Sequence, residues 1–75
     1  MTVQEFTALK KKFGKNLRAV RESKNMSLLD VSYNCGLDYS TISKIERGLV
    51  NPTFKTIVEL GKGLEVHPTE LLSFI

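Results

Sequence analysis

Hydrophobic residues along this chain recur at spacings of three and four, which is the period of amphipathic α-helices. The first series predicts a helix from near Val3 to about Lys24, with Thr2 and Glu5 forming a capping box at its start. Gly14 interrupts the series at a cost of about 1 kcal/mol relative to alanine, so a break or kink there is the alternative to one continuous helix. The apolar positions of this series are Phe6, Leu9, Phe13, Leu17 and Val20.

Between residues 27 and 48, two short helical periods are joined by a tight turn. We expect Gly36 to take a positive φ where the first helix stops, and Asp38 to act as the N-cap of the second. Gly48 should end the second helix. Two helices that cross over a short turn containing glycine form the helix-turn-helix unit. Its inward positions are Leu28, Val31, Ser32, Cys35, Leu37, Ile42 and Ile45.

Two further helices complete the prediction of an all-α fold. Asn51-Pro52 lies in a loop and prevents helix continuation, and Thr53 follows as the N-cap of a fourth helix. His67 stands at the cap position of a last helix, with Pro68 in its first turn. The fourth helix is expected to bury a stripe of five residues, namely Phe54, Ile57, Val58, Gly61 and Leu64.

Length and composition favour one domain covering residues 1–75 of a cytoplasmic protein. The single cysteine excludes an internal disulfide and fits a reducing compartment. No stretch approaches the roughly 18 apolar residues that a membrane span requires. Gln4, Glu5 and the lysines interrupt the apolar residues near the N-terminus, so a signal peptide is not expected there.

The chemistry-bearing residues do not indicate an enzyme. The chain has one histidine and one cysteine, too few for a metal site built from these ligands, and it has no glycine-rich phosphate loop. We therefore expect no cofactor and no metal, with His67 acting as a helix cap and Cys35 in the core. A net charge of +3 is compatible with nucleic-acid binding. The cations gather on two predicted helices, at Lys10, Lys11, Lys12, Lys15, Arg18 and Lys24 on the first and at Lys44 and Arg47 on the third.

From about Phe13 to Leu72 the chain resembles the Cro/CI-type (XRE) family of helix-turn-helix DNA-binding proteins. The resemblance implies a compact five-helix, lambda-repressor-like domain, with the motif at about residues 28–47 and the first helix extended at its N-terminus. Small phage repressors and restriction–modification controller proteins are similar in size. The matching residues are Met26-Ser27, Val31-Ser32, Gly36-Leu37, Ser40-Thr41-Ile42-Ser43-Lys44-Ile45-Glu46-Arg47-Gly48 and Asn51-Pro52-Thr53.

The resemblance implies a sequence-specific transcriptional regulator, a repressor in our interpretation, that inserts the helix at about 39–47 into the major groove of operator DNA. Base contacts are expected from Tyr39, Ser40, Ser43 and Lys44. Phosphate contacts are expected from Ser27, Thr41, Arg47, Asn51 and Thr53.

The family pattern also implies an ion pair and shows one departure in this chain. Arg21 and Glu46 match a pair that joins the first helix to the end of the recognition helix. The family often has glycine where this chain has Glu65, and a left-handed backbone there would be strained.

One such domain recognises only a few base pairs, so we expect a homodimer that binds DNA half-sites about 34 Å apart. We also expect the protein to be associated with the nucleoid. The predicted interface is apolar and C-terminal, formed by residues of the fourth helix with some of Leu71, Leu72, Phe74 and Ile75. The alternative, that these residues complete the core of the protomer, applies best to Leu71 or Leu72. Leu29 and Tyr33 lie together on the outer side of the second helix, where a partner such as RNA polymerase is a candidate. Together with Leu28, they favour the alternative of a protein-interaction module of the same fold, such as an antitoxin or bridging factor. The operator, the regulated gene, any effector and the role of residues 1–9 are not determined by the sequence.

Overall fold

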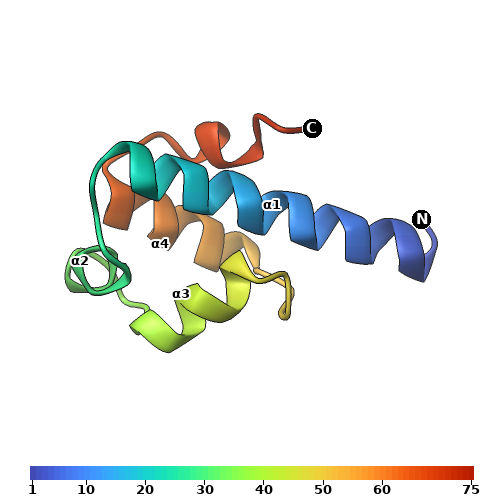
Figure 1. The fold of residues 1–75 in the computed structure, drawn as a ribbon, viewed down its shortest axis with the longest axis horizontal. Helices are drawn as coiled ribbons and strands as arrows, with labels where there is room; N and C mark the ends of the chain where they lie inside the picture. The colour runs from blue at the N-terminus through green and yellow to red at the C-terminus, as the bar shows by residue number, and fades with distance from the viewer.

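The computed structural model describes residues 1–75 and consists of four α-helices and one 3-10 helix, without strands (Figure 1). The helices are α1 (Val3–Ser23), α2 (Leu28–Tyr33), α3 (Tyr39–Glu46) and α4 (Phe54–Leu64), followed by the 3-10 helix η1 (Pro68–Leu72). The all-α prediction is confirmed. The predicted fifth α-helix is instead this single short 3-10 helix, with His67 as its cap: the Thr69 backbone N–H donates to Nδ1 at 3.2 Å.

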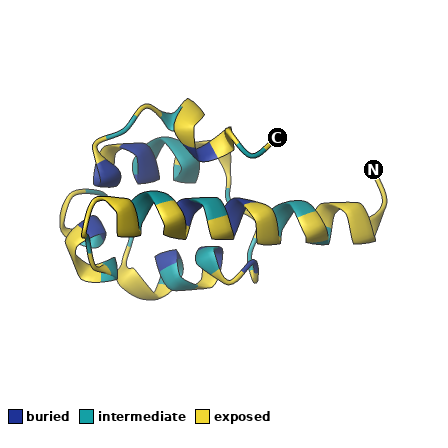
Figure 2. Ribbon diagram, turned by 45° about the horizontal axis from the view of Figure 1, so that its top comes forward, coloured by how far each residue is buried: buried dark blue, intermediate teal, exposed yellow.

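Helix α1 is continuous across Gly14, so the alternative of a break is wrong. The predicted capping box is present at its start. The backbone N–H of Glu5 donates to Thr2 Oγ1 at 3.1 Å, and the N–H of Thr2 donates to Glu5 Oε1 at 3.1 Å. The C-terminal half of α1 crosses the other helices, whereas its N-terminal turns project beyond them and are largely exposed (Figure 2).

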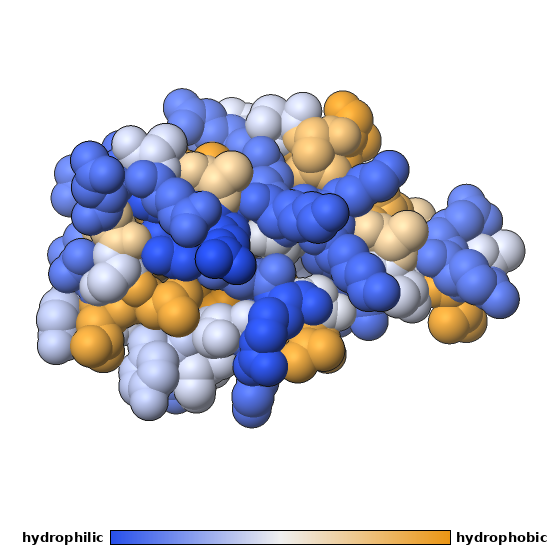
Figure 3. Space-filling view, viewed as in Figure 1, coloured by the Kyte–Doolittle hydropathy of each residue, from blue (hydrophilic) through white to orange (hydrophobic).

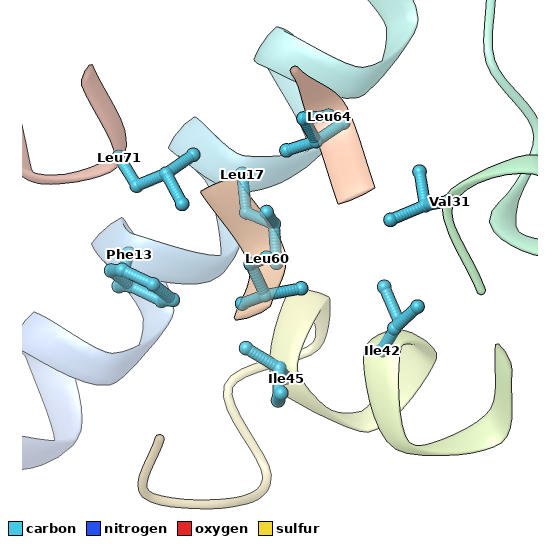
Figure 4. Packing of buried hydrophobic residues seen from close by; sticks show 8 residues of the cluster. All are labelled: Phe13, Leu17, Val31, Ile42, Ile45, Leu60, Leu64 and Leu71. Carbon is cyan, nitrogen blue, oxygen red and sulfur yellow. The ribbon is translucent and has the colours of Figure 1, made fainter. Parts of the chain in front are cut away.

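The core contains eight buried hydrophobic residues that come from all five elements (Figure 4). No buried side-chain nitrogen or oxygen lacks a hydrogen-bond partner, so this core does not bear the cost of an unsatisfied polar group. The eight residues are Phe13, Leu17, Val31, Ile42, Ile45, Leu60, Leu64 and Leu71.

Three local predictions from the sequence are wrong. Phe54 was expected to be buried but is 84% exposed at the first position of α4. Gly36 does not take a positive φ, because α2 already ends at Tyr33 and Asn34 caps it with φ −96°. Leu71 was expected at a dimer interface but is fully buried within the protomer.

The turn after α4 has the left-handed backbone for which the family pattern often uses glycine. Glu65 takes left-handed backbone angles, with φ 59° and ψ 41°. The reversal brings the Val66 N–H to the Gly61 carbonyl at 3.0 Å, which satisfies one of the last carbonyls of the helix. A residue with a β-carbon loses about 1–2 kcal/mol in this conformation.

Two glycines allow α1 and α3 to approach closely. A β-carbon on Gly14 would lie 2.3 Å from the Glu46 carbonyl oxygen and 2.6 Å from that of Ile45. Gly48 follows the end of α3, as predicted, with φ 72°, and a β-carbon on it would lie 2.8 Å from Lys11 Cγ. The helices therefore touch backbone to backbone around these two residues.

We expect Gly14→Ala to destabilise the protein although alanine favours helices. The methyl group would collide with two backbone carbonyls, and overpacking of this kind costs about 1–3 kcal/mol. For a domain of this size, that loss corresponds to a melting temperature about 4–24 °C lower. Circular dichroism during thermal unfolding measures it.

Gly36→Ala is the matched control for this prediction. Its β-carbon would meet only Glu59 Oε2 at 3.5 Å, an ordinary contact, and its φ is negative. The melting temperature of this control should stay close to wild type. Equal melting temperatures for the two variants would show that the approach of α1 and α3 is not tight.

Candidate nucleic-acid interface

Helix α2 and helix α3 each begin with a side-chain cap that fixes its first turn. Ser27 and Asp30 form a capping box, in which the Asp30 N–H donates to Ser27 Oγ at 3.0 Å and the Ser27 N–H donates to Asp30 Oδ2 at 2.8 Å. Asp38 caps α3 by accepting the Thr41 N–H at 2.8 Å. Such caps stabilise a helix by about 1 kcal/mol each, which matters for helices of six and eight residues.

Helix α3 has one buried side and one open side. Ile42 and Ile45 are fully buried beneath it, in contact with the common core. Of the predicted base-contacting residues, Tyr39, Ser40 and Lys44 are exposed, and Ser43 is half-buried. The Ser40 hydroxyl donates to Asp38 Oδ1 at 3.2 Å, so it would exchange this partner to reach a base.

A bidentate ion pair joins α1 to the end of α3. Arg21 Nε donates to Glu46 Oε2 at 2.7 Å, and Nη2 donates to Oε1 at 3.0 Å. A third donor, Nη1, reaches the Met26 carbonyl at 2.9 Å in the loop before α2. The structure thus brings together the two residues that the family pattern paired.

The Arg21–Glu46 pair is more than a surface contact, since its side chains are only 13% and 7% exposed. The hydrogen bond to Glu46 is the main reason that the pKa of Arg21 is raised above its ordinary value. Arginine is already charged at physiological pH, so the guanidinium of Arg21 stays ionised there. Planar two-point bonding fixes the orientation of both side chains as well as their separation.

The predicted phosphate-contacting residues lie at the ends of α2, α3 and α4. Ser27 and Thr53 are exposed N-caps, and the Thr53 hydroxyl accepts the Thr56 N–H at 3.2 Å. Arg47 is exposed at the end of α3, and its Nε donates to the Ser43 carbonyl at 3.4 Å. Asn51 is exposed in the following loop, whereas Thr41 is half-buried. Contact of these residues with DNA stays a prediction.

An apolar groove lies between α1, the loop before α4 and the C-terminal segment. Of the four residues predicted for a dimer interface, Leu72, Phe74 and Ile75 line it, and the Phe13 and Phe74 rings pack edge to face with centroids 6.1 Å apart. The opposite wall comes from Phe6 and other residues of α1. Figure 3 shows hydrophobic residues near the C-terminus, and others near α2, near the end of α3 and toward the N-terminus, on a surface that is mostly hydrophilic.

The sequence prediction missed Phe54 as a surface residue. It stands one helical turn before Ile57, which lines the groove, so both are on the same side of α4. Hydrophobic spacing alone does not distinguish a residue that packs on its own core from one that faces a partner. The position of Phe54 in the first turn of α4, outside the helix crossing, was the only available indication.

Two other properties of the described residues concern chemistry and membranes. No three of the histidine, cysteine, aspartate and glutamate residues gather as metal ligands, and Cys35 is a half-buried free thiol. None of the helices combines the length and apolar character needed to cross a lipid bilayer.

Comparison with known proteins adds a family and several relatives. The model of the helix-turn-helix family HTH_3 matches residues 17–71. The chain is 41% identical over 63 residues to the control protein C.BamHI of Bacillus amyloliquefaciens, a match that covers 83% of this chain and 78% of that protein.

Solved structures show the same arrangement of helices. The restriction–modification controller protein C.AhdI from Aeromonas hydrophila is 36% identical, with a TM-score of 0.81 over 85% of this chain and 97% of that one. The controller protein C.Esp1396I, solved as a tetramer in complex with its natural 35 base-pair operator, is 33% identical, with a TM-score of 0.80 over 88% of this chain and 87% of that one.

The cap of α3 should make the stability of the protein sensitive to acid. The Thr41 hydroxyl is the main cause of a lowered pKa of Asp38, followed by the Thr41 backbone N–H and the Ser40 hydroxyl. Asp38 therefore binds its proton more weakly in the folded chain than in the unfolded chain. Its contribution is fully present above the unfolded pKa of about 4 and is lost as the pH falls through the lower folded value.

Asp38→Asn tests this dependence, because asparagine caps helices well but does not titrate. Melting temperatures measured between pH 6 and pH 2 should fall less steeply below pH 4 for the variant than for wild type. Identical curves would mean that the Asp38 carboxylate does not contribute to acid unfolding.

Proposed function

The chain belongs to the helix-turn-helix family HTH_3, and on that premise we propose that it is a sequence-specific regulator of transcription that binds operator DNA as a homodimer. The observation that carries this proposal is the outer side of α3. Tyr39, Ser40 and Lys44 are exposed there, while the helix beneath them is fixed by two buried isoleucines and the Arg21–Glu46 pair. The 35 base-pair operator bound by C.Esp1396I supports the same type of ligand for this chain.

In this proposal α3 enters the major groove and its N-terminal side chains contact the base edges. Lys44 is the best donor to the acceptors of guanine, although an ammonium discriminates less than a two-point arginine contact. Ser27, Arg47, Asn51 and Thr53 are exposed and would position α3 by contacts with phosphates, as would the free N–H groups at the start of α2.

We further propose that residues 1–75 act as one DNA-binding domain with a binding role and not a catalytic one, in the cytoplasm on nucleoid DNA. Repression would follow from occupying a site that overlaps a promoter. Leu28 stands where the family often has a glutamine, and it packs half-buried against the core, so one phosphate contact of the family pattern is replaced by apolar packing.

The homodimer would use the apolar groove and the exposed residues beside it. Ile75 and Phe54 are 85% and 84% exposed, and Leu72 is 38% exposed. Burying these side chains against a second copy removes apolar area from water, which stabilises the dimer by about 25 cal/mol per Å². Leu71 has no part in this surface because it already belongs to the protomer core.

A protein-interaction role is the second candidate. Leu29 and Tyr33 are exposed on the outer side of α2, away from the buried Val31. This pair would suit a partner protein such as RNA polymerase, a toxin or a bridged factor. Titration against random duplex DNA at two salt concentrations separates the two functions, since a regulator binds at low salt and loses affinity at high salt.

We expect Lys44→Ala to weaken binding to the specific operator by about 1–3 kcal/mol and binding to unrelated DNA much less. The operator is obtained by selecting bound sequences from a random pool, and affinities are measured by fluorescence anisotropy. Lys62→Ala is the control, because it removes an exposed lysine on α4 that pairs loosely with Glu59 at 3.9 Å. Equal losses on both kinds of DNA would show that Lys44 contacts only the backbone.

A charge placed in the dimer surface should dissociate the dimer without unfolding the protomer. Phe54→Asp and Ile75→Asp change strongly exposed side chains, so the core stays intact. We expect each to raise the dimer dissociation constant at least tenfold, in line with the loss of about 1.5–3 kcal/mol of apolar burial. Sedimentation equilibrium measures this constant.

Tyr33→Asp is the matched control, since Tyr33 is also strongly exposed but lies on α2 and not beside the groove. Its dissociation constant should equal that of wild type. Dissociation caused by this control, with no effect of the other two variants, would move the interface to α2.

A further inference from the structure

Helix α1 carries a run of positive charge that the helix-turn-helix does not explain. Residues 7–18 contain four lysines and one arginine and no acidic residue, whereas the rest of the chain has a net charge of −2. Arg18 is paired with Glu22 at 3.4 Å. None of the four lysines takes part in an ion pair within the chain. Unpaired like charges within two helical turns repel one another, so this arrangement is unfavourable for the isolated protein.

Lys11 is the member of this run that lies against the recognition helix. A β-carbon on Gly48 would lie 3.0 Å from Lys11 Cα and 2.8 Å from its Cγ, so Lys11 rests on the backbone directly after Arg47. The N-terminal turns of α1 extend beyond the end of α3 (Figure 1). Because Lys11 lies against Gly48, Lys11 and Arg47 are at the same end of the recognition helix. Both residues are exposed.

Lys10 and Lys12 face other directions than Lys11, whereas Lys15, four residues further along, is about 40° around α1 from Lys11 and lies on the same side of the helix. At 100° per residue, Lys11 is about 60° around α1 from Gly14, the residue that touches α3. Lys12 is about 160° from Gly14 and therefore points away from α3. Lys10 places its ammonium over the Phe6 ring, 5.2 Å from the centroid, and lines the apolar groove.

We propose that Lys11 is a DNA phosphate contact from outside the helix-turn-helix, which together with Arg47 holds the backbone that passes the C-terminal end of α3. This inference rests on the proposed function. The flexible stem of a lysine lets its ammonium reach past Gly48 toward the DNA, and a phosphate would relieve the repulsion within the run. The projecting half of α1 thereby gains a role in affinity that does not depend on base sequence.

Lys11→Gln tests the proposal, with Lys12→Gln as the matched control on the same helix. Affinities for the selected operator and for a scrambled duplex are measured between 50 and 200 mM salt. Loss of one phosphate contact lowers the magnitude of the slope of log K against log salt by about 0.9. The ratio of wild-type to Lys11→Gln affinity should therefore shrink about threefold across this range, equally on both duplexes.

Lys12→Gln should keep the wild-type slope, and Lys11→Arg should restore it. Equal slopes for wild type and Lys11→Gln would overturn the inference while wild-type binding still supports the proposed function. A lower melting temperature of Lys11→Gln with an unchanged slope would also overturn it, since Lys11 would then only offset the partial negative charge at the end of α3. Absence of any binding by the wild type would overturn the proposed function itself.

Discussion

The close contact between α1 and α3 determines how the rest of this molecule can work. At Gly14 the two backbones are too near for a β-carbon, and two turns further along Arg21 closes on Glu46 with two hydrogen bonds. One contact sets the distance between the helices and the other sets their orientation. An eight-residue helix does not hold its shape alone in water, so α3 obtains its position from this contact and from the core below it.

The bridge also connects the recognition helix to the loop that precedes α2. Arg21 Nη1 donates to the Met26 carbonyl, so the same guanidinium joins α1, which carries it, to both α3 and the loop before α2. The cost of removing the two charges from water is offset by their mutual attraction and by the three hydrogen bonds of the guanidinium. Such a pair adds little net stability compared with apolar packing. Its value lies in fixing a single arrangement of α2 and α3 before DNA arrives, which lowers the ordering that binding requires.

Helix α1 has a different role on each side. The side toward the core supplies Phe13 and Leu17, and the side toward α3 supplies Gly14, Arg21 and Lys11. Its projecting turns supply one wall of the apolar groove, and the C-terminal residues supply the other wall. The segment that extends the minimal helix-turn-helix therefore lies between the proposed dimer surface and the end of α3, where it can influence both.

The sequence by itself determined the periodic elements and their caps, because these depend on residues three or four positions apart. It predicted α1 with its capping box, the paired helices, the Asp38 and Thr53 caps and the inward Ile42 and Ile45. Only the tertiary structure decided what depends on distant neighbours. Gly14 appeared as a weakness of α1 until the carbonyls of α3 were seen beside it, and Phe54 shared the apolar spacing of α4 yet lies beyond the crossing helices. Leu71 and Ile75 are equally apolar in sequence, but only Leu71 reaches the core, since burial is a property of the assembled helices and not of a residue type.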